Sequence, residues 1–431
     1  MKLKIALASA TALGLMMSGS AWADSNEAHL SQSGSYNSAL IEQPGEFNDA
    51  GSETQKIRQT GNTNSLSIEQ SGDGNEVGLG TNAITGDHGV LQSSGASPDD
   101  RKQNAMSIVQ SSDGNAVGAV RQQTTTQGDR TRNMLTISQG GDGNNTVGSV
   151  FQTKRSTGPN EATITQTGSA NLVDQISQAN GEGGGGGNVN SLSVTMSGEN
   201  NGAIDALTGS AGASGALSSR IVQGRFSGVQ ADNDQYRNSA TLIVSGNDNR
   251  FGITQYGSTN TVGTLEIGGS FNQVGTYQDG THNVISLAAV TGVENNIGIG
   301  QVGNFNTSDV GVDGNDNELQ VSQNGDNNLA SVLVTGNSNG AGNLFSGAAL
   351  IANGGVSSGS GLITQLGDNN IANLTVSGSS NAFGLGSNGD SNTITGSVDG
   401  DFNQVVVAQH GSLNTATFTQ NGNGNNIGIV Q

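Results

Sequence analysis

The sequence predicts an all-β fold, specifically a β-solenoid of about fourteen two-stranded rungs. Three observations support this: Gly-x-x-Asn recurs every eleven residues, apolar residues alternate between these motifs, and large apolar residues are scarce. The 431 residues include 69 Gly, 3 Pro and no Cys, and 3% are aromatic. Such a composition favours disorder or a thin repetitive structure over a thick core. The fixed period favours the repetitive structure.

The first 23 residues are typical of a secretory signal peptide. Lys2 and Lys4 precede an apolar stretch, and the small-residue site ending at Ala23 predicts cleavage before Asp24. Cleavage removes two lysines and no acid, so the formal net charge changes from −20 to −22. Nucleic acid and anionic membrane surfaces repel such a chain. No later segment reaches the ~20 apolar residues of a membrane span, so we expect neither nucleic-acid binding nor membrane insertion.

The repeat is clearest near the C-terminus, where Asn403, Asn414 and Asn425 stand eleven residues apart. Each has a Gly three residues earlier. Nearer the N-terminus the step survives in pairs such as Asn37 and Asn48. The complete repeat is therefore about 22 residues, or two strands. We expect a polar lead at 24–31, repeats with long insertions over 32–207, an insertion or linker at 208–237, and a more regular array over 238–431 with an insertion at 340–366.

Between turns the residues alternate with the period of a strand. In "NSALIEQ", residues 37–43, the side chains of Asn37, Ala39, Ile41 and Gln43 share one face. Two strands cannot bury their inner faces alone, so the repeats must stack. We expect the inward amides to bond along the stack as ladders, as in cross-β structures. The ladder residues predicted are Asn37, Gln43, Asn64, Gln70, Asn104, Gln110, Asn133, Gln139, Asn160, Gln166, Asn317, Gln323, Asn403, Gln409, Asn414, Gln420, Asn425 and Gln431.

Some strands carry an apolar residue where the terminal Gln would stand, which predicts a drier core in the later half. These residues are Met196, Val244, Val312, Val334, Val376 and Val398. The long connectors each follow the second strand of a repeat, so we expect all the extra chain along one edge of the solenoid. Their Gly-rich, polar composition favours tolerated slack over binding loops. They are 82–103, 122–132, 179–189, 208–237 and 340–366.

The array resembles the curlin repeat of curli subunits. The resemblance is carried by "QSGSYNSALIEQ" at 32–43, "QTGNTNSLSIEQSGDGNEVG" at 59–78 and "QHGSLNTATFTQNGNGNNIGIVQ" at 409–431. It implies a secreted bacterial protein that polymerises into extracellular amyloid fibres, the curli fimbriae that serve adhesion and biofilm matrix. Implied partners are other copies of the chain, a curli-type nucleator, a periplasmic chaperone and an outer-membrane secretion pore, which the polar lead would address. No cofactor is implied.

Catalytic and metal-binding patterns are missing from the sequence. His29, His88, His282 and His410 are scattered over different repeats, whereas a metal or general-base site needs converging groups. Acidic turns such as "SGDGNE" raise a calcium alternative, but calcium solenoids repeat every nine residues. "GEGGGGG" lacks the Lys-Ser/Thr ending of a phosphate loop. We therefore expect no enzyme, cofactor or metal.

The runner-up function is a secreted β-solenoid adhesin that does not polymerise and binds ligands through its insertion loops. A polysaccharide-cleaving β-helix enzyme would need three-stranded coils and a cluster of acids and bases on one face, and the sequence shows neither. The final segment, "NGNGNNIGIVQ", fills a strand with no visible cap, and soluble solenoids need caps. We therefore favour head-to-tail stacking, with the end strand meeting the first rung, residues 37–43, of another copy.

Overall fold

The computed structural model describes residues 25–80, 89–94, 104–124, 133–154, 158–180, 189–224, 237–340, 342–356 and 359–431. The fold is all-β, a parallel β-solenoid of about 13 turns, which confirms the predicted fold class. The chain divides into two units. Unit 1 contains 1–202 and 219–238, and unit 2 contains 203–218 and 239–431. The signal peptide lies outside the described residues.

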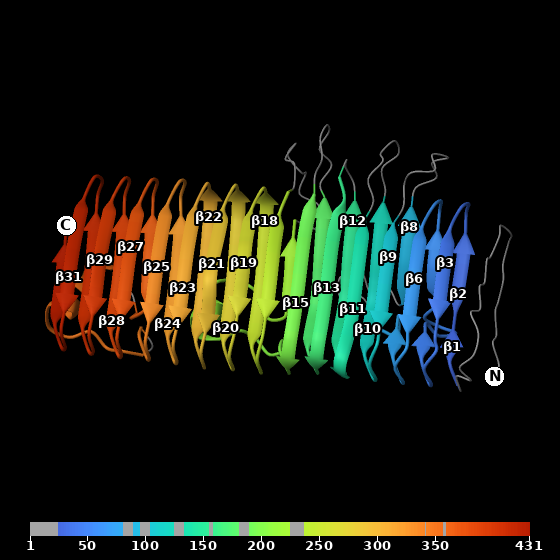
Figure 1. Ribbon diagram of the computed structural model, residues 1–431. Coiled ribbons are helices and arrows are strands. Elements are labelled where there is room, and N and C mark those ends of the chain that lie inside the picture. The colour runs from blue at the N-terminus through green and yellow to red at the C-terminus, as the bar shows by residue number, and fades with distance from the viewer. Residues whose placement is uncertain are drawn as a thin grey trace. The chain divides into compact units, whose positions relative to one another are not determined.

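Unit 1 consists of two parallel sheets (Figure 1). Its first sheet contains β1 (Glu27–Ala28), β2 (Leu30–Ser33), β4 (Asp49–Ala50), β5 (Ile57–Thr60), β7 (Glu76–Val77), β8 (Val90–Ser94), β10 (Ala116–Thr124), β12 (Thr146–Lys154), β14 (Leu172–Asn180) and β16 (Arg220–Gln223). Its second sheet contains β3 (Ser38–Glu42), β6 (Ser65–Gln70), β9 (Ala105–Gln110), β11 (Met134–Gly143), β13 (Asn160–Ser169) and β15 (Asn190–Glu199).

Unit 2 repeats the arrangement. Its first sheet contains β18 (Arg250–Ser258), β20 (Gln273–Thr281), β22 (Asn296–Asn304), β24 (Glu318–Asn324), β26 (Leu362–Leu366), β28 (Ala382–Asn388), β30 (Gln404–His410) and β32 (Asn426–Val430). Its second sheet contains β17 (Ser239–Val244), β19 (Thr261–Ile267), β21 (Val284–Thr291), β23 (Thr307–Asp313), β25 (Leu329–Thr335), β27 (Ile371–Ser377), β29 (Thr393–Asp399) and β31 (Thr415–Asn421). Two helices, α1 (Gly209–Ala213) and α2 (Gly347–Val356), belong to unit 2.

Strands pair in register, so like residues form columns. Ile68 pairs with Ile41 on one side and with Ile108 on the other. Ile68 and Ile108 are completely buried, as are Ile137 and Ile164 farther along the column. The core is therefore a thin apolar layer between the two sheets, which is how a chain poor in aromatics still buries its inner faces.

The turns explain the Gly-x-x-Asn spacing. In the turn from β25, Gly336 has φ 107° and Ser338, just before the ladder Asn, has φ 55°. A Cβ on Gly336 would collide with the carbonyl oxygen of Gly378, the turn glycine stacked on it. Only glycine lets turns approach this closely and also adopts a positive φ at no steric cost.

The insertions are placed differently from the expectation of a single edge. The insertions that carry α1 and α2 interrupt strands of the first sheet, and they begin just after Asn201 and Asn339. The helices contact strands of the first sheet of unit 2, α1 on β20, β22 and β24 and α2 on β28, β30 and β32. They therefore lie on a sheet face, and the one-edge expectation is wrong for these two insertions.

Several segments that the sequence predicted to be connectors contain strands of the first sheet. β8 within 82–103 pairs with β5 and β10, β16 within 208–237 pairs with β14, and β26 within 340–366 pairs with β24. The expected polar lead, 24–31, contains β1 and the start of β2, which pair with β4 and β5. The first rung therefore begins before Gln32. Residues 125–132 and 181–188, parts of two other connectors, lie outside the description.

Candidate assembly surface

The Gln ladder of the second sheet in unit 1 has a direction. Gln43 Nε2 donates to Gln70 Oε1 at 2.9 Å, and Gln70 Nε2 donates to Gln110 Oε1 at 2.9 Å. The pattern continues through Gln139 to Gln166. Every Nε2 thus points toward the next rung in the C-terminal direction and every Oε1 toward the preceding one. At Met196 the amide ladder stops: Gln166 Nε2 donates to the carbonyls of Thr146 and Asn171, but on the next rung it meets the Met sulfur at 3.9 Å in place of an amide oxygen.

A second Gln ladder, not in the predicted set, runs through the first sheet of unit 1 with the same direction. Gln32 donates to Gln59 at 2.6 Å, and Gln59 donates to Gln92 at 2.8 Å. Its first two members, Gln32 and Gln59, lie two residues before a turn glycine, in the Gln-x-Gly-x-x-Asn motif, and this was the signal that could have identified them. In unit 2 the first-sheet ladder includes Gln323 and Gln409, and it ends with Gln409 donating to Gln431 at 3.0 Å.

The Asn ladders point the other way. Asn64 Nδ2 donates to Asn37 Oδ1 at 3.0 Å, and Asn104 Nδ2 donates to Asn64 Oδ1 at 2.9 Å. Asn133 and Asn160 continue this column in the second sheet. In the first sheet of unit 2, Asn317 donates to Asn295 and Asn425 donates to Asn403. Each Asn oxygen therefore accepts from the rung on its C-terminal side.

The second sheet of unit 2 carries a buried aliphatic column where unit 1 has its Gln ladder. Val312, Val334, Val376 and Val398 are at most 2% exposed. Gln420 follows Val398 in register, and its buried Oε1 finds no partner among the described residues because Val398 has no donor. The structure thus places Gln420 at the end of an apolar column, and brings Asn414 into the Asn ladder through a backbone N–H···Oδ1 bond to Asn392 at 3.0 Å.

The C-terminal rung of unit 2 leaves acceptors on its outer side. Asn425 and Asn414 donate through their amides, but among the described residues their Oδ1 atoms accept nothing. Within the described part of the chain, Gln431 Nε2 donates only to the carbonyl of Thr415, at 3.1 Å. On this strand, β32, every side chain is at least partly exposed.

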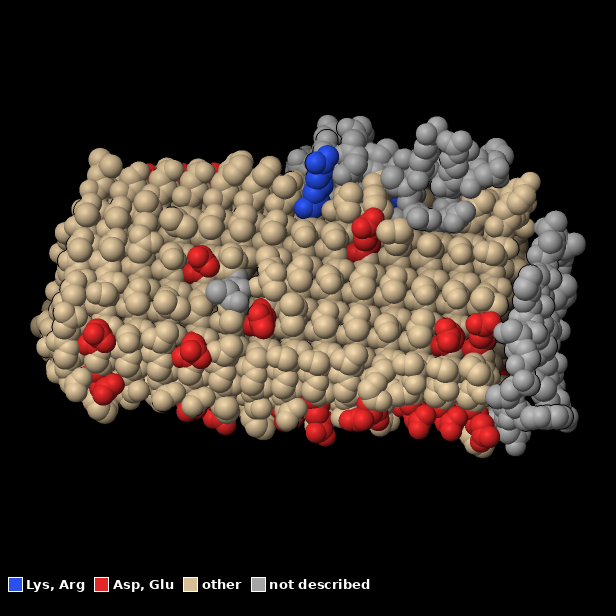
Figure 2. Space-filling view, viewed as in Figure 1, with Lys and Arg blue, Asp and Glu red and all other residues tan. Residues whose placement is uncertain are grey.

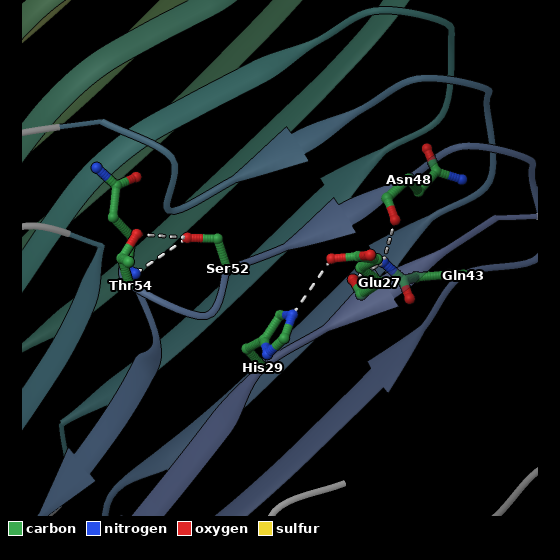
Figure 3. Close-up of polar contacts among 7 residues, drawn as sticks. Glu27, His29, Gln43, Asn48, Ser52 and Thr54 are labelled. Carbon is green, nitrogen blue, oxygen red and sulfur yellow. Dashed lines mark hydrogen bonds and ion pairs between the residues drawn. The ribbon is translucent and has the colours of Figure 1, made fainter. Parts of the chain in front are cut away.

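The N-terminal rung of unit 1 has the converse groups. Gln43 Nε2 donates to backbone oxygens and to Gln70, while Gln43 Oε1 and Gln32 Oε1 accept nothing among the described residues. Figure 3 shows Gln43 beside Asn48, and His29 bonded to Glu27 at 3.3 Å. Asn26 starts the first-sheet Asn ladder, because its Oδ1 accepts the N–H of Asn48 at 2.7 Å.

Acidic residues line one edge of unit 1 (Figure 2). Glu27, Asp49 and Glu76 form one column, and the neighbouring turns stack Glu46 on Asp73. Burial raises the pKa of the Asp49 carboxyl, the charges of Glu27 and Glu76 raise it further, and His29 opposes them. Stacking like charges at rung spacing disfavours their ionised forms.

The histidines do not converge in the part of the chain that the structure describes. His282 stacks on Phe305 with ring centroids 4.7 Å apart, His410 pairs through its backbone with Gln431, and His88 lies outside the description. No metal-holding group of His, Asp or Glu occurs among the described residues. The acidic turns instead accept backbone N–H groups, as when Asp326 donates its N–H to Asp368 Oδ1 at 2.8 Å. None of the described helices has the length and apolarity of a membrane span.

Comparison with known families gives one match. Residues 314–342, which include β24 and β25, match the family model described as Curlin associated repeat. No curated protein matches the chain. The family match and the β-solenoid fold together support a curlin-repeat protein.

Proposed function

We propose that this chain is a structural subunit of extracellular curli-like amyloid fibres, which assemble by head-to-tail stacking and serve adhesion, aggregation and biofilm matrix. A curlin repeat on a β-solenoid fits a structural subunit and supports a non-enzymatic, extracellular role. The observation that carries the proposal is the opposite direction of the Asn and Gln ladders.

Because the ladders are directional, the two end rungs are complementary. The C-terminal rung offers Asn414 and Asn425 oxygens and the Gln431 amide. The N-terminal rung offers the oxygens of Gln32 and Gln43, and the amides at Asn26 and Asn37 could donate in return. Stacked at ~4.8 Å, these groups would continue each ladder into the next copy, as inside the chain. If two C-terminal rungs faced each other, the Asn414 and Asn425 oxygens of one copy would face the same acceptor oxygens of the other and could not form hydrogen bonds with them.

The export partners belong to the same proposal. A signal peptide would direct the chain to the periplasm, where a chaperone and then an outer-membrane pore would handle it, and a nucleator would start the fibre. Since β1 and β2 occupy part of the segment 24–31, that segment would address the pore while unfolded and join the first rung after export.

The alternative of a non-polymerising adhesin has no specific support from the described insertions. Those carrying α1 and α2 pack their helices on the first sheet of unit 2. The test is assembly of the chain without residues 1–23. We expect thioflavin-binding fibres with a reflection near ~4.7 Å, seeded by preformed fibre. A chain that stays monodisperse for days at high concentration and mild pH would refute the proposal.

A further inference from the structure

The two helices of unit 2 rest on the first sheet in the same way. α1 lies over β20, β22 and β24, and α2 over β28, β30 and β32. Gly298 and Gly428 stand at corresponding places on β22 and β32. A Cβ on Gly298 would collide with the Ser210 carbonyl, and one on Gly428 would collide with the Ala348 carbonyl. The two segments are therefore docked at equal depth, residue for residue.

Their polar contacts match on two successive rungs. On the first, Thr208 N–H donates to Gln273 Oε1 at 3.0 Å and Ser346 N–H donates to Gln404 Oε1 at 2.6 Å. Gln273 and Gln404 occupy the same position of the repeat, just after a ladder Asn.

On the second rung, Ala211 N–H donates to Asn296 Oδ1 at 2.6 Å and Ala349 N–H donates to Asn426 Oδ1 at 2.7 Å. Asn296 returns a bond to the Thr208 carbonyl, and Asn426 returns one to the Ser346 carbonyl. The segment of α1 is thus a template for that of α2.

The segment of α1 also makes a contact on a third successive strand, β24, and among the described residues the segment of α2 has no such third contact. Glu318, paired in register with Asn296, accepts the Ser210 N–H at 3.2 Å and the Ser210 hydroxyl at 3.1 Å. The corresponding donor in α2 is the N–H of Ala348, which lies in the first helical turn and has no intrahelical acceptor. Asn426 lies on β32, the outermost described strand of the sheet, so no described strand supplies the third carboxylate.

The first rung of the chain matches that third rung. "NEAHLSQ" at 26–32 aligns with "NELQVSQ" at 317–323, sharing the Asn, the Glu and the final Ser-Gln. Asn26 is the first member of the first-sheet Asn ladder, as Asn317 is an inner member. Because β32 belongs to the first sheet and residues 37–43 to the second, the end strand would meet residues 26–32 of another copy, and the expected pairing with 37–43 is wrong. If Asn26 of another copy stacked on Asn425, its Glu27 would follow Asn426 as Glu318 follows Asn296. The Glu27 side chain is 65% exposed.

We propose that α2 bridges the junction between two copies, with the Ala348 N–H donating to the Glu27 carboxylate of the second copy. The inference rests on the proposed function, since it presumes head-to-tail stacking. Charge is complementary, because a carboxylate is stabilised at the positive N-terminal end of a helix. Glu27 Oε2 is bonded to His29, which leaves Oε1 for this contact. Each junction then repeats the arrangement already built once inside the chain.

Cross-linking tests the contact, because the chain has no native Cys. The full chain without its signal peptide carries Glu27→Cys with Ala348→Cys, and fibres are treated with a short bis-maleimide. Dissolved in strong denaturant, they should run as covalent multimers. The matched control, Ser210→Cys with Glu318→Cys, should link within one chain and run as a monomer. A reactive control beside a test pair that yields only monomers would overturn the proposal.

A second measurement decides the matter even if the cysteine variants assemble poorly. Glu27→Ala should raise the critical concentration of assembly about 3- to 10-fold, as expected for losing a partly exposed charged hydrogen bond. Glu69→Ala removes the same charge from an exposed site on β6 and should leave it unchanged. Equal critical concentrations for the two variants would refute the bridge while leaving the fibre intact. If the unmodified chain forms no fibre, the proposed function itself fails.

Discussion

Replacing one ladder glutamine by an apolar side chain of the same volume should lower the free energy of unfolding, although it leaves no cavity. Gln110 is completely buried, accepts from Gln70, and donates to Gln139 Oε1 at 2.9 Å and to the Asn115 carbonyl at 3.0 Å. Gln110→Leu keeps the volume but leaves the buried Gln139 Oε1 without its donor. An orphaned buried acceptor costs about 1–3 kcal/mol, whereas a hydrogen bond whose two partners are both replaced by apolar groups costs close to nothing. We expect a total of about 3 kcal/mol.

The triple variant Gln70→Leu, Gln110→Leu, Gln139→Leu separates a ladder from independent residues. In the triple variant, Gln166 Oε1 at the end of the replaced stretch is the one ladder oxygen that loses its donor. The backbone carbonyls of Asn75 and Asn115 each keep a backbone N–H. The cost should therefore stay near ~3 kcal/mol instead of rising to ~9 kcal/mol. The aliphatic column of unit 2 is a natural example of such a replacement.

Hydrogen exchange is the suitable assay, because repeat arrays open locally and need not unfold in one step. Peptides covering β9 and β11 would be followed at low concentration, before fibres form. The single variant should lower the local opening free energy by about 3 kcal/mol, and the triple variant by about the same amount. Costs that add up over the three sites would show that each glutamine acts alone, and the ladder account would be wrong.

Three further predictions follow from the turns and charges. Because the pKa of Asp49 is raised in the fold, its ionised form is destabilising, so the stability of the first rungs should rise as pH falls from neutral through that pKa. Asp49→Asn should stabilise these rungs at pH 7 and flatten their pH dependence in hydrogen exchange, and an unchanged pH profile would argue against this. Gly336→Ala should destabilise by about 2 kcal/mol or more in urea unfolding, because its Cβ meets the Gly378 carbonyl at a positive φ. Gly354→Ala in α2, where nothing lies near the added Cβ, should be neutral or mildly stabilising. Added salt should shorten the thioflavin lag by screening a net charge near −20, whereas a lag independent of salt would exclude charge repulsion as the brake.

The sequence predicted the strands best where the repeat keeps both its Gly and its Asn. The alternation in 64–70 identifies β6 because period 2 is a local property of the chain. β4 and β5 were not recognised as one rung, because residues 51–56 interrupt it and the pairing with β7 and β8 is visible only in three dimensions.

The helices were missed for a similar reason. α1 is five residues of Gly, Ser and Ala, a composition that reads as slack and is too short to be stable alone. Its conformation depends on Gln273, Asn296 and Glu318, which lie on three separate repeats. The first rung escaped recognition because "NEAHLSQ" has no Gly three residues before its Asn, although it carries the same Asn and Gln as later rungs.

The direction of stacking is tested most directly by blocking one end at a time. Ala39→Lys with Ile41→Lys puts charges on the inward face of β3, and Ile427→Lys with Ile429→Lys does so on β32. Unpaired buried charges prevent stacking on the altered rung. Mass measurement in solution should find each variant monomeric alone and an equimolar mixture dimeric but no larger, since one open end of each kind remains. Dimers of either variant alone, or a mixture that stays monomeric, would contradict head-to-tail assembly.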